Sequence, residues 1–245
     1  MEAPHSSLSH YYGDESNRQS WVRGLFNRSA ANYDRVESAM AFGTGSWYRH
    51  RALIASGLRR GMRVVDVGVG TGLVAREAAS IVGDAGLVTG VDPSSGMLAN
   101  AKVPAGVNLL LGSAERIPVD DASADFLSMG YALRHLDDLA AAFSEFFRVL
   151  KPGGLLCVLE FTLPEGSVSR ALLKGYMRGV VPGLAAILTR QHSMPTLMRY
   201  TWETIEACVP PAIVVQGIES AGFSRVSRHV ELGIFSEYRA CKPAG

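Results

Sequence analysis

The stretch that decides the fold is Val64-Val65-Asp66-Val67-Gly68-Val69-Gly70-Thr71-Gly72, a short apolar run that leads into three spaced glycines. The apolar run is typical of a buried strand, and the glycines indicate a tight turn into a helix. Because glycine has no Cβ, the backbone of such a turn can approach a ligand closely, and the amides that open the next helix face the same point. A turn of this kind can equally bind a dinucleotide or be an ordinary strand-to-helix junction.

Apolar runs and helical patterns alternate after this stretch. Strands that alternate with helices are typical of a parallel sheet with helices on both faces. A hairpin turned at Glu231-Leu232-Gly233 closes the pattern. We therefore predict an α/β fold with a doubly wound, mostly parallel seven-stranded sheet. The expected helices are 73–82, 94–101, 137–150 and 212–221, and the expected strands are 64–67, 87–91, 107–111, 125–130, 155–161, 223–230 and 234–241.

Helical segments are expected to flank this core. Residues 1–60 comprise a polar arm of about twenty residues, which we expect to be mobile, and helices over 21–58. Residues 61–163 form the cofactor-binding core, residues 164–210 a helical insertion over the substrate, and residues 211–245 the last helix and strands. The apolar stretch 172–188 can line a pocket, form a dimer face or belong to the core, and we favour the core.

Composition narrows the class of protein. The 245 residues include 24 Lys and Arg against 23 Asp and Glu, and the basic residues are scattered, so nucleic acid is not an expected partner. Cys157, Cys208 and Cys241 lack metal-ligand spacing, and we expect no metal site and no disulfide. No signal pattern and no apolar run long enough for a bilayer is evident, which predicts a cytoplasmic protein without stable membrane insertion.

A second acid narrows the ligand. Asp92 ends the strand 87–91, where its carboxylate can accept hydrogen bonds from both ribose hydroxyls of an adenosine. Nucleotide phosphates favour Gly-x-Gly-x-x-Gly, whereas this chain has Gly-x-Gly-x-Gly with Asp66 two residues before it. An acid there would repel a pyrophosphate, and it fits the ammonium or sulfonium side of a ligand better. A nicotinamide oxidoreductase remains the weaker alternative.

Four motifs in order carry a resemblance to a known family. They are Val64–Gly72, Val91-Asp-Pro-Ser-Ser-Gly-Met97, Gly112-Ser-Ala-Glu-Arg-Ile-Pro118 and Arg148-Val-Leu-Lys-Pro-Gly-Gly154. They resemble the motifs of class I S-adenosylmethionine (SAM)-dependent methyltransferases. Over residues 25–165 the chain is most similar to the quinone-ring C-methyltransferases of ubiquinone and menaquinone biosynthesis, whose landmarks match Phe26-Asn-Arg-Ser-Ala-Ala-Asn-Tyr33-Asp34, Ala132-Leu-Arg-His135 and Val158-Leu-Glu-Phe161.

The resemblance implies a set of SAM-binding residues. Gly68 and Gly70 pass close to the methionine part, and Asp92 holds the ribose. Position 113 is usually Asp in such motifs, so Ser113 departs from the pattern. Tyr33 resembles the tyrosine that reaches the SAM carboxylate, and its alternative is a place in an aromatic core stripe. The predicted cofactor residues are Tyr33, Asp66, Gly68, Gly70, Asp92, Pro93, Met97, Ser113, Ala114 and Met129.

Candidate catalytic residues follow the fourth strand and lie in the flanking segments. Arg134 and His135 come at the carboxyl edge of the sheet, where the quinone-ring family has Arg-Asn. Arg134 has an alternative role in a salt bridge to Glu160 or Asp137. The further candidates to orient the acceptor or take its proton are Tyr11, Tyr12, His192 and Tyr200.

The expected activity is methyl transfer to a small planar ring. Because the C-terminal third departs from the quinone-ring pattern, we favour a conjugated, heteroaromatic or quinone-like acceptor of specialised-metabolite biosynthesis, methylated on nitrogen, oxygen or carbon. The alternatives are a quinone-ring C-methyltransferase of ubiquinone and menaquinone biosynthesis, and a protein that binds SAM without transferring its methyl group. A small-molecule acceptor and a homodimer are the expected partners.

Overall fold

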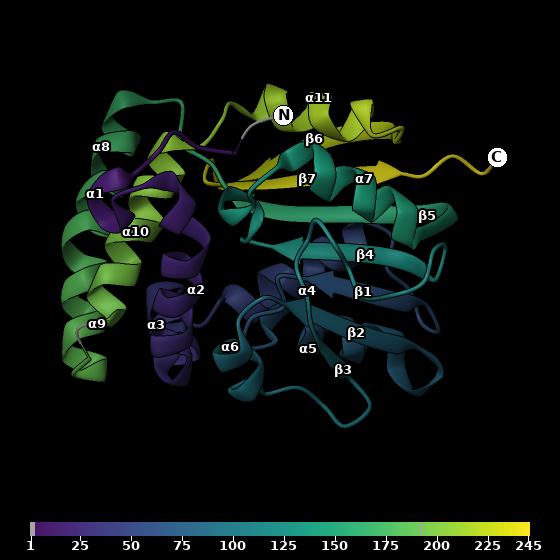
Figure 1. The fold of residues 1–245 in the computed structure, drawn as a ribbon, viewed down its shortest axis with the longest axis horizontal. Coiled ribbons are helices and arrows are strands. Elements are labelled where there is room, and N and C mark those ends of the chain that lie inside the picture. The colour runs from purple at the N-terminus through teal and green to yellow at the C-terminus, as the bar shows by residue number, and fades with distance from the viewer. Residues whose placement is uncertain (1–2, 192) are drawn as a thin grey trace.

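The computed structural model describes residues 3–191 and 193–245, which form one seven-stranded sheet with helices on both faces and a helical layer at one end (Figure 1). The strand order is β3-β2-β1-β4-β5-β7-β6. Strand β7 alone runs in the direction opposite to the other six strands. The predicted fold class and the closing hairpin are confirmed. The strands are β1 Arg63–Val67, β2 Leu87–Asp92, β3 Asn108–Leu111, β4 Ala124–Gly130, β5 Leu150–Phe161, β6 Ser224–Glu231 and β7 Phe235–Cys241.

Helices cover the two faces of the sheet in pairs. Successive residues of a strand point to opposite faces, so Val64 packs toward one pair of helices and Val65 toward the other. One face carries α4 (Gly45–Ala55) and α5 (Leu73–Val82), together with the short turn η3 (Gly83–Ala85). The other face carries α7 (Leu139–Val149) and α11 (Pro211–Ser220), while α6 (Ser95–Ala99) and η4 (Leu133–His135) follow β2 and β4.

Several core boundaries differ from the prediction by one or two residues, and β5 begins five residues earlier than expected. Helix α6 ends at Ala99, two residues before the expected end. The Lys-Pro-Gly-Gly run that was expected to separate a helix from a strand lies inside β5. Leu150 pairs with Ala124 and the next pairs begin at Leu155, so the intervening residues form an irregularity in the ladder in which Gly153 has a φ of +79°.

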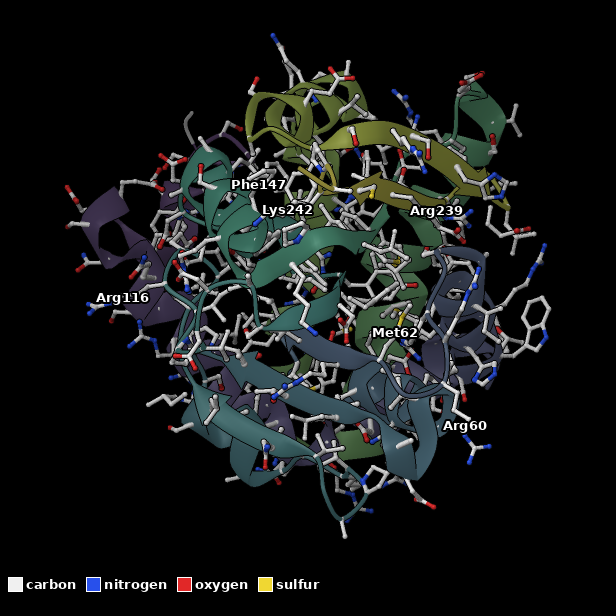
Figure 2. The ribbon with its side chains drawn as sticks, turned by 90° about the vertical axis from the view of Figure 1, so that its right-hand side faces the viewer. Arg60, Met62, Arg116, Phe147, Arg239 and Lys242 are labelled. Atoms are coloured by element: carbon white, nitrogen blue, oxygen red, sulfur yellow. The ribbon has the colours of Figure 1, made fainter. Side chains whose placement is uncertain are left out.

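At the end of the sheet opposite the helical layer, Lys242, which follows β7, attaches the C-terminal strand to α7. The ammonium group of Lys242 donates hydrogen bonds to the carbonyl oxygens of Phe147 (2.6 Å) and Leu150 (2.7 Å). It also lies 4.5 Å from the centre of the Phe147 ring (Figure 2). A cation at the C-terminus of a helix satisfies carbonyls that have no partner within the helix. These contacts therefore fix β7 to α7.

The helical layer lies at the carboxyl ends of the parallel strands (Figure 1). It is called the lid layer here and joins the N-terminal helices to the insertion between β5 and α11. Its core contains Trp202 and Tyr200, both with no exposed surface. The elements are α1 Ser9–Tyr12, η1 Glu15–Asn17, α2 Arg18–Ser29, η2 Ala30–Asn32, α3 Tyr33–Met40, α8 Ser167–Gly175, the π-helix η5 Tyr176–Val180, α9 Val181–Thr189 and α10 Ser193–Ala207.

The N-terminal arm, which is expected to be mobile unless it orders against another surface, packs against the insertion over residues 3–20. The carbonyl oxygen of Pro4 accepts a hydrogen bond from the backbone N–H of Val209 (2.7 Å), and the hydroxyl of Tyr12 accepts one from the N–H of Leu8 (2.7 Å). Tyr12 is 6% exposed. The arm is polar on average, but its aromatic side chains find apolar surface on the insertion, far away in sequence.

The insertion also differs from the expectation for residues 172–188. Helices α8 and α9 and the π-helix between them form one 23-residue helix, Ser167–Thr189, whose length, and a mean hydropathy of 1.3 over its most apolar 18 residues, would allow it to cross a membrane. The expectation that no stretch is long and apolar enough was wrong. Only 22% of its most apolar window is buried, so the preference for a core role holds for one side of the helix only. That side places Met177, Val181 and Ala185 against α10.

Candidate functional site

A cavity of about 410 Å³ lies between the lid layer and the carboxyl ends of the strands. Loops after β1, β2, β3 and β4 contribute its floor, as expected for a ligand site in an open α/β sheet. Most of the predicted residues meet there. Its lining includes Tyr33, Gly68, Gly70, Asp92, Pro93, Met97, Ser113, Ala114, Met129, Arg134 and His135.

The glycine turn takes the shape that its sequence predicts. Gly68, Gly70 and Gly72 all have positive φ values of +69°, +55° and +90°, which side-chain-bearing residues rarely adopt. A Cβ on Gly68 would lie 2.6 Å from the Cβ of Ala132, and one on Gly72 would lie 2.4 Å from Val103. The turn therefore presents bare backbone to the cavity.

Asp92 is held at the end of β2 by two backbone amides. Its Oδ2 accepts from the N–H of Gly70 (2.8 Å) and its Oδ1 from the N–H of Ser94 (2.8 Å). Burial raises the pKa of Asp92 to about 6, against the lowering effect of these hydrogen bonds. The carboxylate thus links the glycine turn to the start of α6 and keeps lone pairs for hydroxyl donors in the cavity.

The raised pKa predicts a pH dependence of cofactor binding. Ribose hydroxyls donate best to the ionised carboxylate, and protonation removes that acceptor. SAM affinity is therefore expected to fall as the pH drops below about 6, by up to roughly tenfold per pH unit. Isothermal calorimetry across this range measures the effect. Asp92→Asn should bind weakly at every pH, and a wild-type affinity that does not change below the pKa would contradict the assignment.

One wall of the cavity, which the family resemblance assigns to adenine, is built around α6. The hydroxyl of Ser94 accepts from the N–H of Met97 (3.1 Å) and donates to the amide oxygen of Asn27 (2.7 Å). That oxygen also accepts from the N–H of Gly96 (2.8 Å). Asn27, from α2, therefore ties the lid layer to the start of α6, a contact that no local pattern showed.

Asp66 does not line the cavity. It is 1% exposed, and its Oδ1 accepts a hydrogen bond from the hydroxyl of Ser128 (2.7 Å) on the neighbouring strand. Burial raises its pKa to about 7. The expectation of a direct place beside a ligand cation is not met, because the side chain points into the sheet below the glycine turn.

Tyr33 lines the cavity from the start of α3. The next residue, Asp34, connects the lid layer to the core. Asp34 accepts a hydrogen bond from the hydroxyl of Thr71 in the glycine turn, and it pairs with Arg76 of α5 (3.3 Å). Burial raises the pKa of Tyr33, so its hydroxyl stays neutral and can donate to a carboxylate. The contacts of Asp34 fix Tyr33 over the turn.

Arg134 forms the buried ion pair that was its alternative role. Its Nη1 lies 2.5 Å from Oε1 of Glu160 and donates to the carbonyl oxygen of Tyr131 (2.8 Å). The two charged side chains are 4% and 3% exposed. Arg134 nevertheless lines the cavity, and its Nε has no hydrogen-bond partner in the described structure. Pairing and contact with an acceptor are therefore compatible.

His135 lines the cavity with both ring nitrogens buried and without a partner among the described residues. Its ring stacks on Tyr200 at 5.6 Å and meets the edge of Phe26 at 5.2 Å. Burial, and next the charge of Arg134, lowers its pKa well below the usual value. His135 is therefore a neutral imidazole that can accept or donate a hydrogen bond.

The three tyrosines that were candidates for catalysis, Tyr11, Tyr12 and Tyr200, do not line the cavity. Tyr200 is fully buried behind His135, and Tyr12 donates to Glu15 (3.1 Å) within the arm. Tyr11 packs between Trp21 and Tyr200. Direct contact of these hydroxyls with an acceptor is not supported, because helix packing turns them into the lid core. His192 lies outside the described residues.

Two arginines that were not predicted from the sequence also line the cavity. Arg49 of α4 is 4% exposed, pairs with Glu37, and lies 5.7 Å from the ring of Tyr131. Arg18 of α2 is 5% exposed and pairs with Asp137 (2.6 Å). Neither α2 nor α4 has a clear amphipathic pattern, so periodicity does not assign these basic residues to a buried face.

An aromatic wall completes the acceptor side of the cavity. The rings of Tyr131 and Phe161 lie 4.8 Å apart, and Phe235 lies 5.5 Å from Phe161. Tyr131 follows β4 with a φ of +60°, an uncommon conformation for a residue with a large side chain. Such strain is concentrated at functional sites. The wall gives a planar ring a surface on which to stack.

These features fit SAM. The bare glycine backbone leaves room for a methionine moiety, and the Asp92 carboxylate suits a ribose. Met97 and Pro93 supply an apolar wall for adenine. The aromatic wall of Tyr131, Phe161 and Phe235 lines the same cavity as the glycine turn and offers an acceptor ring a stacking surface.

Comparisons with known proteins agree with this geometry. A model of the ubiE/COQ5 methyltransferase family matches residues 14–242. The ubiquinone/menaquinone biosynthesis C-methyltransferase UbiE of Shewanella halifaxensis is 32% identical over 213 residues, 84% of each chain. The corresponding protein of Shewanella woodyi is 34% identical over 76% of this chain and 78% of its own length.

Solved structures share the fold. A SAM-dependent methyltransferase of Thermotoga maritima, described as a possible histamine N-methyltransferase, superposes with a TM-score of 0.62 over 89% of this chain and 98% of its own, at 24% identity. Phosphoethanolamine N-methyltransferase 2 of Haemonchus contortus, solved with SAM, superposes with a TM-score of 0.60 over 97% of this chain and 60% of its own, at 17% identity. The chain therefore belongs to the ubiE/COQ5 methyltransferase family and is a SAM-dependent methyltransferase.

Proposed function

We propose that this enzyme C-methylates a quinol-type aromatic ring. The observation that carries the proposal is the aromatic wall of Tyr131, Phe161 and Phe235, which lines the same cavity as the glycine turn and Asp92, with the Arg134 guanidinium 5.6 Å from the centre of the Phe161 ring. The family match supports a quinone-ring acceptor over the specialised-metabolite acceptor favoured by the sequence. We further propose that residues 1–60 and 164–210 enclose the acceptor and that the enzyme acts in the cytoplasm.

The roles of the residues follow from their charges. SAM supplies an electrophilic methyl group, which an electron-rich ring carbon attacks in line. In this proposal, neutral His135 accepts a hydrogen bond from a ring hydroxyl and orients it, and the Arg134 guanidinium stabilises the negative charge that develops on that oxygen. The stacking wall holds the ring plane. The demethylated cofactor would leave as the methyl group transfers, and the proton on the methylated carbon then passes to water, which restores aromaticity.

Product analysis tests this proposal. The enzyme is incubated with labelled SAM and a demethylated quinol, and in parallel with hydroxylated nitrogen heterocycles. Mass spectrometry locates the label, and NMR distinguishes a methyl on carbon from one on oxygen or nitrogen. A C-methylated quinol supports the proposal. An N- or O-methylated heterocycle would favour the specialised-metabolite alternative, and unconsumed SAM would favour binding without transfer.

His135→Phe is expected to lower kcat by about 100-fold with little change in SAM affinity, because the ring shape is kept while both nitrogens are lost. His135→Asn keeps a donor and an acceptor and should retain most of the turnover. Steady-state kinetics and SAM calorimetry on both variants measure the effect. Equal loss in the two variants would assign His135 to packing against Tyr200.

A further inference from the structure

Exposed large apolar side chains gather on one region of the molecule. Apart from Leu111, those in the described residues all fall within segments 42–54, 168–187 and 230–232. Phe42 is 82% exposed, Ile187 78% and Leu232 77%. Such gatherings on a protein surface mark interaction sites. The complete set is Phe42, Trp47, Ile54, Val168, Leu172, Val180, Ile187, Val230 and Leu232.

Contacts bring the three segments together at the mouth of the cavity. The ring of Tyr176 stacks on Phe42 at 6.5 Å, which joins the first segment to the long helix. Arg51 pairs with Glu231 at 3.6 Å, which joins it to the β6–β7 turn. Trp47 and Leu232 both line the cavity and are both well exposed, so the cavity reaches the protein surface at these two side chains.

The long helix has two unlike sides. Its inner side, with Met177, Val181 and Ala185, packs in the lid core, so the helix cannot leave the protein to cross a bilayer without exposing that core. Its outer side exposes Leu172 and Ile187. We call Phe42, Trp47, Leu232 and the outer side of this helix, with Val168, Leu172, Val180 and Ile187, the apolar rim.

Positive charge accompanies the rim. Residues 167–190 contain Arg170, Lys174, Arg178 and Arg190 and no acidic residue. Lys174 is paired with Glu206 (2.6 Å), and the other three have exposed side chains. Arg51 lies 5.5 Å from the ring of Trp47. Apolar residues flanked by arginine and lysine are typical of surfaces that lie in the headgroup region of an anionic bilayer.

We propose that the apolar rim docks on the surface of an anionic lipid bilayer, with the cavity mouth facing the lipid. A lipid-soluble acceptor then passes from the bilayer, past Trp47 and Leu232, to the aromatic wall of the cavity. The route of the acceptor rests on the proposed function, whereas the docking does not. A second copy of this chain is the less favourable occupant, because a two-fold contact would place the helix arginines opposite each other.

Flotation with vesicles tests the docking. The full-length protein is mixed with vesicles of phosphatidylcholine containing phosphatidylglycerol, or of phosphatidylcholine alone. We expect binding at least about tenfold stronger to the anionic vesicles, weakened by salt. Trp47 emission should shift to the blue on binding, and Trp47→Phe should lose that shift.

Leu172→Glu with Ile187→Glu is expected to reduce vesicle binding by at least about tenfold. Leu111→Glu is the matched control, because Leu111 is 64% exposed at the end of β3 but lies outside the rim. Retained SAM affinity shows that the double variant is folded.

Three outcomes would overturn the docking. They are absence of binding to either vesicle, equal loss in the control variant, or binding that the double variant leaves unchanged. A concentration-dependent dimer that Leu172→Glu abolishes, without vesicle binding, would assign the rim to a second copy instead. Vesicle binding needs no acceptor, so failure to methylate a quinol would refute the proposed function and leave the docking intact.

Discussion

Asp92→Ala is expected to weaken SAM binding by about 100- to 10,000-fold. A carboxylate that accepts from two ribose hydroxyls makes two charge-assisted hydrogen bonds, each of about 1.5–3 kcal/mol, and every 1.4 kcal/mol corresponds to about tenfold in affinity. The substitution also leaves the N–H groups of Gly70 and Ser94 without their acceptor. The glycine turn therefore loses its tie to α6, which adds to the loss.

Calorimetry with SAM and with its demethylated product measures the effect. Asp125→Ala is the matched control, because that carboxylate also accepts from a backbone amide, the N–H of Arg63 (2.8 Å), but at the opposite end of the sheet. The control should bind SAM as the wild type does. Wild-type SAM affinity in Asp92→Ala, in a variant with an unchanged thermal transition, would refute the ribose assignment.

Arg134→Ala is expected to lower kcat by at least about 100-fold and SAM affinity far less. A guanidinium aimed at a developing oxygen anion contributes mainly in the transition state, where a lost donor costs about 2.7–4 kcal/mol. The same substitution strands the Glu160 carboxylate, which is 2% exposed. Breaking a buried pair in this way costs about 3–5 kcal/mol of folding stability. A loss of activity alone would therefore not identify the role.

A double variant separates the two roles. Glu160 also accepts hydrogen bonds from the backbone N–H groups of Arg134 (3.2 Å) and Phe161 (2.8 Å), so its replacement must keep an acceptor. Arg134→Met with Glu160→Gln removes both charges and keeps that acceptor, and it is therefore expected to regain most of the thermal stability but none of the turnover. Thermal unfolding and quinol turnover are measured on the single and double variants. Turnover that returns together with stability would make the Arg134–Glu160 pair a structural brace.

Local chemistry explains why the cofactor half of the site was predictable. Val64–Gly72 encodes a strand, three positive φ values and a helix start within nine residues, so neighbours in sequence decide the geometry. Asp92 follows the next strand and reaches the same turn because parallel neighbours end at the same edge of the sheet. The positions of the glycine turn and of Asp92 therefore depend on backbone geometry alone.

Positions on the lid depended on helix packing instead. Tyr12 and Tyr200 were candidates for the acceptor pocket, yet both are buried in the lid core. Arg49 and Arg18 were not candidates, and both line the cavity. Which side of a helix faces a cavity depends on the angle at which that helix crosses its neighbours, and periodicity gives no such angle.

The sequence by itself determined the sheet, the glycine turn, Asp92 and the family, because these follow from short-range backbone preferences and from motifs in a fixed order. Only the tertiary structure decided that Asp66 turns away from the cavity, that Arg134 pairs with Glu160, and that the helix at 167–189 leaves an apolar side exposed. Each of these depends on contacts between residues far apart in the chain, whose free energy is set by packing and burial rather than by the local order of residues.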